Sequence, residues 1–333
     1  MTQFVENLMS RASKLAKTIA LAEGTDVRAA KAAEILTQKN VCKVVLIGNE
    51  DEIKAKFPEI DFTGVSFDDP KTSEHRAEYA NTLYELRKAK GMTEEQALNI
   101  VTNNNMFYAC VALKRGDVDG VVGGAVFSSA DVSRAAFQVI KAAPGISSVS
   151  SCFVMVPPED FKYKKYPAYI FSDCAVIPYP TSDQLSDIVV AAADSAKKIC
   201  EMDPKIAMLS FSTKGSANHE SVEKVRVAYQ KVREEHPEIV VDGELQLDAS
   251  LVDSVANQKA PGSPVAGQAN VLVFPNLDAG NIGYKIAQRF GNCMAIGPIM
   301  QGLALPVNDL SRGCVAEDIA AVAAITALQS VKD

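Results

Sequence analysis

Short apolar runs alternate along the chain with stretches whose apolar residues recur at helical spacing. In the first half we expect strands at 18–23, 43–48 and 118–127, and helices at 27–38 and 131–141. Strands that alternate with amphipathic helices are typical of α/β proteins with mainly parallel sheets. The first half therefore predicts an α/β unit.

The alternation restarts after the turn-forming stretch "KAAPGISS". The further expected elements are strands at 147–156, 168–173, 205–212 and 270–275 and helices at 182–200, 218–235 and 316–329. We interpret this half as a second α/β unit. The Pro/Gly-rich stretches "APGSPVAGQ" and "GPIMQGLALPVN" are expected to be loops, and the latter is interpreted as the return to the first domain. The expected domains are 1–145 plus 306–333, and 146–305.

Charge and cysteine content narrow the class of protein. The chain has 333 residues and a formal net charge of -7, which argues against a general nucleic-acid or membrane-surface binder. The N-terminus carries acids and no sustained apolar core, so neither a signal peptide nor a spanning helix is expected and the predicted compartment is the cytoplasm. Seven cysteines without a C-x-x-C pair, and three separated histidines, disfavour a disulfide framework and a metal site.

The stretch "SSADVSR" follows the apolar run "GVVGGAVF" and is a candidate anion site. Ser128, Ser129 and Asp131 are possible N-caps, and Arg134 lies about one turn inside the expected helix. Hydroxyls, free N–H groups and a guanidinium together can receive an anion. The alternative interpretation is a well-capped helix with a solvated arginine.

A second candidate is the stretch "NDLSRGCVAEDI" ahead of the last expected helix. Ser311 and Arg312 precede a helix N-terminus, where free N–H groups and a guanidinium can bind an anion. Asp318 in the first turn is equally explained by the helix dipole. Since no histidine lies near any of these motifs, a proton-transfer step would fall to a carboxylate, a lysine or water.

Other cations follow expected strands or lie on expected helices. Lys285 and Arg289 are four residues apart on one helical face, a spacing that usually marks a solvated surface. Arg87 lies on a polar helix, where a surface ion pair is the ordinary interpretation.

Several stretches together resemble the phosphate acetyltransferase family, also called phosphotransacetylases. The resemblance covers nearly the whole chain, and its most specific blocks run from "APGSPVAG" to "YKIAQR" and through "NDLSRG". The other stretches that carry it are "AEGTDVRAAKAAEIL", "DGVVGGAVFSSADVSRA", "FSDCAVIPYP", "MLSFSTKGSA", "DGELQLDAS" and "GPIMQGLALPVNDLSRGC".

The resemblance implies two α/β/α domains with an active-site cleft between them and a homodimer. It implies reversible acetyl transfer between CoA and phosphate with no tightly bound cofactor, in metabolic coupling to acetate kinase; activation by a monovalent cation is left open. Ser311, Arg312 and Asp318 fill the family's catalytic positions, and Arg87, Arg134 and Arg289 match arginines that bind anionic substrates. With the candidates above, the substrate-binding residues expected are Arg87, Ser128, Ser129, Arg134, Lys285 and Arg289.

Three alternatives stay open at this point. Ala135 stands where relatives often carry Pro, and Ile177 where a polar residue is common, so the enzyme could prefer butyryl or propionyl phosphate. A non-catalytic sensing domain is disfavoured because Ser311, Arg312 and Asp318 are all present. A dehydrogenase of related fold is disfavoured by the absence of a G-x-G-x-x-G motif.

Overall fold

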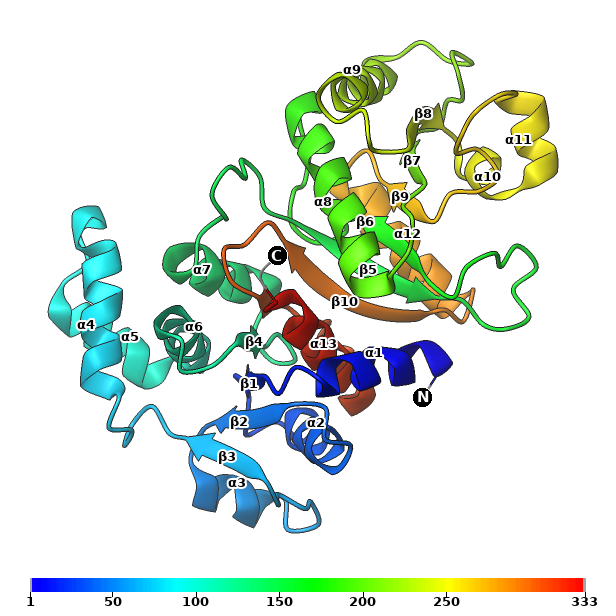
Figure 1. The fold of residues 1–333 in the computed structure, drawn as a ribbon. Coiled ribbons are helices and arrows are strands. Elements are labelled where there is room, and N and C mark those ends of the chain that lie inside the picture. Colours follow the sequence, from blue (N-terminus) through cyan, green and yellow to red (C-terminus); the bar gives the residue numbers. More distant parts are fainter. Residues whose placement is uncertain (1, 332–333) are drawn as a thin grey trace. The chain divides into compact units, whose positions relative to one another are not determined.

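The chain divides into two compact units in a computed structural model that describes residues 2–331. Unit 1 comprises Met1–Pro144 and Leu303–Asp333, and unit 2 comprises Gly145–Gly302. In Figure 1 the red C-terminal helix belongs with the blue and teal elements of unit 1, whereas unit 2 runs from green to orange. Both units are of the expected α/β class.

Unit 1 contains a five-stranded parallel sheet. Its strand order is β11-β4-β1-β2-β3. The strands are β1 Thr18–Leu21, β2 Lys43–Ile47, β3 Val65–Asp68, β4 Gly120–Val122 and β11 Val307–Asn308. The helices are α1 Gln3–Ser13, α2 Val27–Gln38, α3 Glu50–Lys56, α4 Arg76–Arg87, α5 Glu94–Asn103, α6 Asn105–Arg115, α7 Ser129–Val139 and α13 Ala316–Gln329, with a 3-10 turn at Lys88–Lys90.

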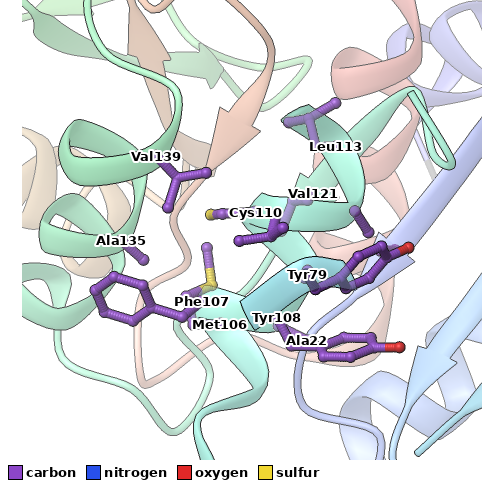
Figure 2. Close-up of a cluster of buried hydrophobic side chains, with 14 of the residues drawn as sticks. Ala22, Tyr79, Met106, Phe107, Tyr108, Cys110, Leu113, Val121, Ala135 and Val139 are labelled. Atoms are coloured by element: carbon purple, nitrogen blue, oxygen red, sulfur yellow. The ribbon is translucent and has the colours of Figure 1, made fainter. Parts of the chain in front are cut away.

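Helices cover both faces of the unit 1 sheet. Ala20 and Ala22 point into a cluster built mainly from α4 to α7, whose members include Tyr79, Met106 and Val139 (Figure 2). On the other side of the sheet, α13 contacts both α1 and α2. There α13 approaches β4 so closely that a Cβ on Gly120 would lie 2.3 Å from Thr326. Small residues thus allow helices to pack tightly on both faces.

Unit 2 contains a six-stranded mixed sheet. Its strand order is β10-β5-β6-β9-β7-β8; the pairs β10-β5 and β5-β6 are antiparallel and the other three are parallel. The strands are β5 Ser150–Val156, β6 Tyr169–Ser172, β7 Ile206–Leu209, β8 Val241–Leu245, β9 Val271–Val273 and β10 Met294–Gln301. The helices are α8 Ser182–Cys200, α9 Glu220–Glu235, α10 Leu247–Leu251, α11 Asp253–Lys259 and α12 Leu277–Arg289.

The prediction of a loop throughout "GPIMQGLALPVN" is wrong at both ends, because its last two residues form β11, which pairs with β4. Residues 297–301 complete β10, an edge strand of the unit 2 sheet. The pairing of β10 with β5 shifts register between Ile296 and Ile299, at the Gly297–Pro298 dipeptide. A proline, which has no N–H, is tolerated at such an irregularity on an edge strand. Glycine and proline content therefore predicted a loop at Gly297 and Pro298, whereas both residues belong to an edge strand.

The expected strand at 118–127 is also wrong in length. Strand β4 spans only Gly120–Val122, and the chain then leaves the sheet. The backbone N–H groups of residues 124–127 donate to the side chain of Glu23 and so are not used by a neighbouring strand. An apolar run is therefore diverted into a loop by a carboxylate about one hundred residues away in sequence.

Candidate active site

Three loops meet at the carboxyl edge of the unit 1 sheet. They follow β1, β4 and β11, which are neighbours in the sheet, and they cover residues 22–26, 123–128 and 309–315. Each loop leads to the N-terminus of a helix, namely α2, α7 or α13. Because ligands of open α/β sheets bind beyond the carboxyl ends of strands, this edge is the candidate site of unit 1.

Glu23 holds the loop after β4 in place. Its side chain is buried, with 6% exposed. One carboxylate oxygen accepts the N–H groups of Gly124 and Ala125 at 3.0 and 2.8 Å, and the other accepts those of Val126 and Phe127, both at 2.7 Å. Four donors converging on one carboxylate compensate the desolvation of its charge. The shape of loop 123–128 therefore depends on an acid from the neighbouring strand.

Arg28 connects all three loops. Its guanidinium pairs with Asp26 at 2.9 Å, and this hydrogen bond lowers the pKa of the Asp26 carboxyl. It also donates to the carbonyl oxygens of Ala125 (2.7 Å) and Arg312 (2.8 Å) and, more weakly, to that of Cys314 (3.4 Å). The planar fork of an arginine can make these bonds in several directions at once. Arg28 therefore positions the backbone that carries Arg312.

Ser311 and Arg312 form a turn ahead of α13. The N–H of Cys314 donates to the carbonyl oxygen of Ser311 at 2.9 Å, and the Ser311 hydroxyl accepts a long 3.4 Å bond from the N–H of Gly313. The Arg312 side chain is exposed and makes no hydrogen bond or ion pair with any residue in 2–331. Its five donors are therefore available to an anionic ligand.

Asp318 lies in the first turn of α13. One carboxylate oxygen accepts the N–H of Val315 at 3.0 Å, so the side chain caps the helix. The residue is half-buried. A carboxylate has about four acceptor positions, so accepting the Val315 N–H is compatible with accepting a proton.

The start of α7 matches the cap expected from "SSADVSR". Ser128 is the N-cap and its hydroxyl accepts the N–H of Asp131 at 3.2 Å. Ser129 begins the helix and is exposed. Arg134 pairs with Asp131 at 2.8 Å, with 56% and 41% of the two side chains exposed. Exposed pairs of this kind contribute about 0–1 kcal/mol, so an incoming phosphate can compete for Arg134.

Asp309 lies buried directly after β11, with 2% of the residue exposed. Burial raises the pKa of its carboxyl to about 6, against the opposing influence of the Ser129 hydroxyl and the Leu310 N–H. Its Oδ1 is buried and has no hydrogen-bond partner among the described residues. Asp309 therefore has a buried carboxylate oxygen without a hydrogen-bond donor, whereas the Glu23 carboxylate accepts four N–H groups.

Cys314 lies close to the guanidinium of Arg28, with 3.8 Å between Nη1 and Sγ. Burial nevertheless raises the pKa of the thiol to about 11, because desolvation outweighs the attraction of Arg28. The nucleophilic form of cysteine is the thiolate. This thiol is therefore not activated in the manner of a catalytic cysteine.

The remaining candidate cations lie on α4 and α12. Arg87 is the last residue of α4 in unit 1, whereas Lys285 and Arg289 lie on α12 of unit 2. The Lys285 ammonium donates to Asn281 at 2.9 Å. Within residues 2–331, Arg87 and Arg289 resemble Arg312 in that their guanidinium groups have no hydrogen-bond or ion-pair partner, and Nε of Arg87 is buried without one.

Within residues 2–331, no three or more His, Cys, Asp or Glu side chains are grouped so that they could hold a metal ion. In the same part of the chain, no helix combines the length and the apolar character needed to cross a bilayer.

Comparison with known proteins gives the family. Residues 3–327 match the family described as Phosphate acetyl/butaryl transferase. The chain belongs to this family. Its relatives include a phosphate acetyltransferase from Acetivibrio thermocellus, which is 50% identical over 98% of both chains. Solved structures similar to this chain include two phosphotransacetylases. A phosphotransacetylase from Streptococcus pyogenes has 40% sequence identity and a TM-score of 0.89 over 99% of both chains. The EutD phosphotransacetylase from Staphylococcus aureus has 42% sequence identity and a TM-score of 0.86 over 98% of both chains.

For this member of the phosphate acetyl/butaryl transferase family, residue patterns did not single out Glu23, Arg28 or Asp309. Each had a signal in the sequence. Glu23 is a charged residue that directly follows the apolar run "TIALA", and Asp309 directly follows "LPVN". Arg28 lies in the stretch "AEGTDVRAAKAAEIL". An acid at the end of a buried strand is costly unless it has a partner, so its position alone is informative.

Proposed function

We propose that the protein is a phosphate acetyltransferase, which catalyses the reversible conversion of acetyl-CoA and phosphate to acetyl phosphate and CoA. The observation that carries the proposal is the turn before α13, where an unpaired Arg312 guanidinium follows Ser311 and precedes the Asp318 carboxylate in one short segment. Phosphoryl oxygens are bound well by a planar guanidinium, which can donate two parallel hydrogen bonds.

In this proposal Arg312 binds the phosphoryl group, Ser311 donates to the charge that develops on the carbonyl oxygen, and Asp318 accepts the CoA thiol proton. The sulfur attacks the acetyl carbonyl carbon directly in a ternary complex. The new C–S bond forms as the C–O bond to phosphate breaks, the electron pair leaves with phosphate, and the thiol proton ends on the released phosphate. No acyl-enzyme is needed, because CoA itself supplies the nucleophile.

The proton transfer is energetically feasible. Reference pKa values place an aspartate about 4.6 units below a thiol, so full transfer costs about 6 kcal/mol. A turnover near 10³ s⁻¹ corresponds to a barrier of about 13 kcal/mol, which leaves roughly half for attack on the carbonyl. Asp318 therefore suffices as base without a histidine.

Further cations would neutralise the remaining charges of CoA and acetyl phosphate. We assign this role to Arg87, Arg134, Lys285 and Arg289, and assign Ser128 and Ser129 as hydroxyl and N–H donors at the start of α7. The support is that Arg87 and Arg289, like Arg312, have guanidinium groups without protein partners within residues 2–331. That substrate binds in a cleft between the domains stays a prediction.

The direct test is formation of acetyl-CoA from acetyl phosphate and CoA by the purified protein, followed as thioester and as released phosphate. Arg312→Gln is the matched loss variant, and Arg115→Gln is its control because Arg115 pairs with Glu78 on α4 and α6. Propionyl and butyryl phosphate are assayed in parallel, and the largest kcat/KM identifies the preferred acyl group. Absence of thioester with every acyl phosphate would refute the proposal.

We also propose that the protein is a homodimer that pairs through α12. Ile282, Ile286 and Phe290 are spaced four residues apart and are 57%, 53% and 91% exposed, so they form an apolar stripe on one side of the helix. An exposed stripe of large apolar side chains favours association. Light scattering should report a dimer for the wild type and a monomer for Ile286→Asp, whereas Val227→Asp on α9 should leave the dimer intact.

The cellular setting is proposed on chemical grounds. We place the protein in the cytoplasm, where CoA is available, and in metabolic coupling to acetate kinase, which would consume or supply acetyl phosphate. Activation by a monovalent cation is tested by exchanging potassium for a bulky organic cation at constant ionic strength. A change in kcat would support activation.

A further inference from the structure

Two carboxylates meet at Gly124 in the loop after β4. Glu23 accepts the N–H of Gly124, and the Asp309 carboxylate lies close to the Cα of the same glycine. A Cβ at position 124 would lie 2.1 Å from Oδ1 of Asp309, so only glycine fits there, and its φ of +116° is also one that glycine favours. Asp309 is thus enclosed within the candidate site.

The two carboxylates differ in how they are compensated. Glu23 accepts four N–H groups at 2.7 to 3.0 Å, whereas Oδ1 of Asp309 has no donor within residues 2–331. A buried carboxylate oxygen without a donor disfavours the ionised form of its carboxyl group. The environment of Asp309 therefore favours its protonated form, in agreement with its raised pKa of about 6.

The charged groups that act on Asp309 come from two directions. Glu23 at the end of β1 disfavours its ionised form, and Arg312 on its own loop favours it. The α7 side contributes the uncharged hydroxyl of Ser129, and Leu310 contributes a backbone N–H. Arg312 is the only cation of this set, and the proposed function assigns it to the phosphoryl group.

We propose that Asp309 is a positioning residue whose protonation is linked to anion binding at Ser311 and Arg312, so that it takes up a proton when a phosphoryl dianion binds and releases it when the dianion leaves. This inference rests on the proposed role of Arg312. A bound dianion neutralises Arg312 and adds negative charge beside Asp309, and both effects disfavour the ionised carboxylate.

The linkage has a functional consequence. A neutral Asp309 no longer repels the dianion and can donate a hydrogen bond where the ionised form can only accept. The proton comes from solvent on binding and returns to solvent on release, so it is not consumed in acyl transfer. Anion affinity should then weaken as the pH rises above about 6, because the dianion must compete with ionisation of Asp309.

Inorganic sulfate is the probe, because it stays a dianion over the whole range and contributes no proton of its own. Calorimetric titration of the wild-type protein with sulfate, in two buffers of different ionisation enthalpy near pH 7, counts the protons exchanged. We expect net proton uptake. Binding without uptake would overturn the inference, and acetyl-CoA formation by the same preparation would show that the proposed function stands regardless.

The variant Asp309→Asn mimics the protonated form in nearly the same volume. Wild-type affinity for sulfate should fall about tenfold between about pH 5.5 and about pH 8, which corresponds to a change of one unit in the pKa of Asp309 on binding. Over the same pH range, the sulfate affinity of Asp309→Asn should stay near the value that the wild type has at the low-pH end. The control is Asp119→Asn, at the other end of β4 where Asp119 pairs with Lys17; it should retain the wild-type slope.

Two results would contradict the assignment. If circular dichroism shows that Asp309→Asn is folded and its sulfate affinity still falls with pH as in the wild type, the proton belongs to another group. If Arg312→Gln bound sulfate as tightly as the wild type, the coupling between Arg312 and Asp309 would be the wrong account. An unfolded Asp309→Asn leaves the wild-type calorimetric proton count as the deciding measurement.

Discussion

The Arg28 guanidinium donates a 2.8 Å hydrogen bond to the backbone carbonyl oxygen of Arg312. The two residues are separated by 284 positions in sequence, yet this bond joins the start of α2 to the turn before α13. A second bond from the same guanidinium reaches Ala125 in the loop after β4. The orientation of the Arg312 backbone therefore depends on Arg28.

Arg28→Ala should lower kcat by roughly 10- to 100-fold, because a displacement of about 1 Å in a positioned group can have an effect of that size. Arg28→Lys should recover only part of the loss, since an ammonium cannot reach Asp26, Ala125 and Arg312 together. Steady-state kinetics and the thermal midpoint are measured on both. Arg115→Ala is the control, and an Arg28→Ala enzyme with wild-type kcat would refute the positioning role.

Asp318→Asn should lower kcat by roughly 10² to 10⁴ while the fold is preserved, because the amide oxygen can still accept the N–H of Val315 but cannot accept a proton. Asp318→Ala should lose the same activity and, in addition, about 1 kcal/mol of stability through loss of the cap. Urea denaturation separates the two variants, and Glu317→Gln is the neighbouring control. Near-normal kcat in Asp318→Asn at neutral pH would remove Asp318 from the role of base.

Arg312→Gln should impair acetyl-CoA formation and its reversal, since the same phosphoryl group is bound as acetyl phosphate and as phosphate. Arg312→Lys should restore activity only in part, because an ammonium is a point charge and cannot form the two parallel bonds of a guanidinium. Initial rates in both directions test this. Equal activity of Arg312→Lys and the wild type would mean that bidentate phosphoryl binding is the wrong account.

Cys314→Ala should keep most of its activity, because burial raises the pKa of this thiol to about 11 and leaves little thiolate at neutral pH. For the same reason the wild type should not exchange labelled phosphate into acetyl phosphate without CoA. An exchange that occurs in the wild type and disappears in Cys314→Ala would instead establish an acetyl-cysteine intermediate.

Asp309→Asn should stabilise the folded protein at pH 8 but not at pH 4. Folding raises the pKa of Asp309 from its ordinary 3.8 to about 6, so the folded state favours the protonated form. The associated stability is fully present below about pH 3.8 and is lost as the pH rises through about 6, which amounts to about 3 kcal/mol at pH 8. The asparagine variant is neutral throughout and avoids this loss. Urea midpoints at both pH values provide the test, and equal midpoints at pH 8 would contradict it.

Local sequence was sufficient for elements whose signals lie within a few residues. The helix expected at 182–200 is α8, and its capping box between Thr181 and Gln184 involves side chains three positions apart. The cap at Ser128 was likewise predicted from its own short motif. Periodicity of apolar residues also sufficed for the α/β class, because burial on one helical face or in a sheet is repeated within each element.

The candidate site residues were less evident from local pattern. Spacing alone supported a helix cap at Ser128 and offered Arg87 only as a surface residue; the roles of Ser311, Arg312 and Asp318 came from resemblance to a family. Those roles stay predictions until the variants above are measured. The structure adds that the guanidinium groups of Arg87, Arg289 and Arg312 have no hydrogen-bond or ion-pair partner within residues 2–331.

Tertiary structure alone decided what the polar groups of the sheet edge do. The sequence by itself determined an α/β chain with capped helices, since those features depend on neighbours along the chain. It did not determine that Glu23 would convert the apolar run 123–127 into a loop, or that Pro298 would lie on an edge strand. Nor did it determine that Asp309 would be buried beside Gly124. Each of these outcomes depends on groups far apart in sequence that only the packed sheet brings within hydrogen-bonding or contact distance.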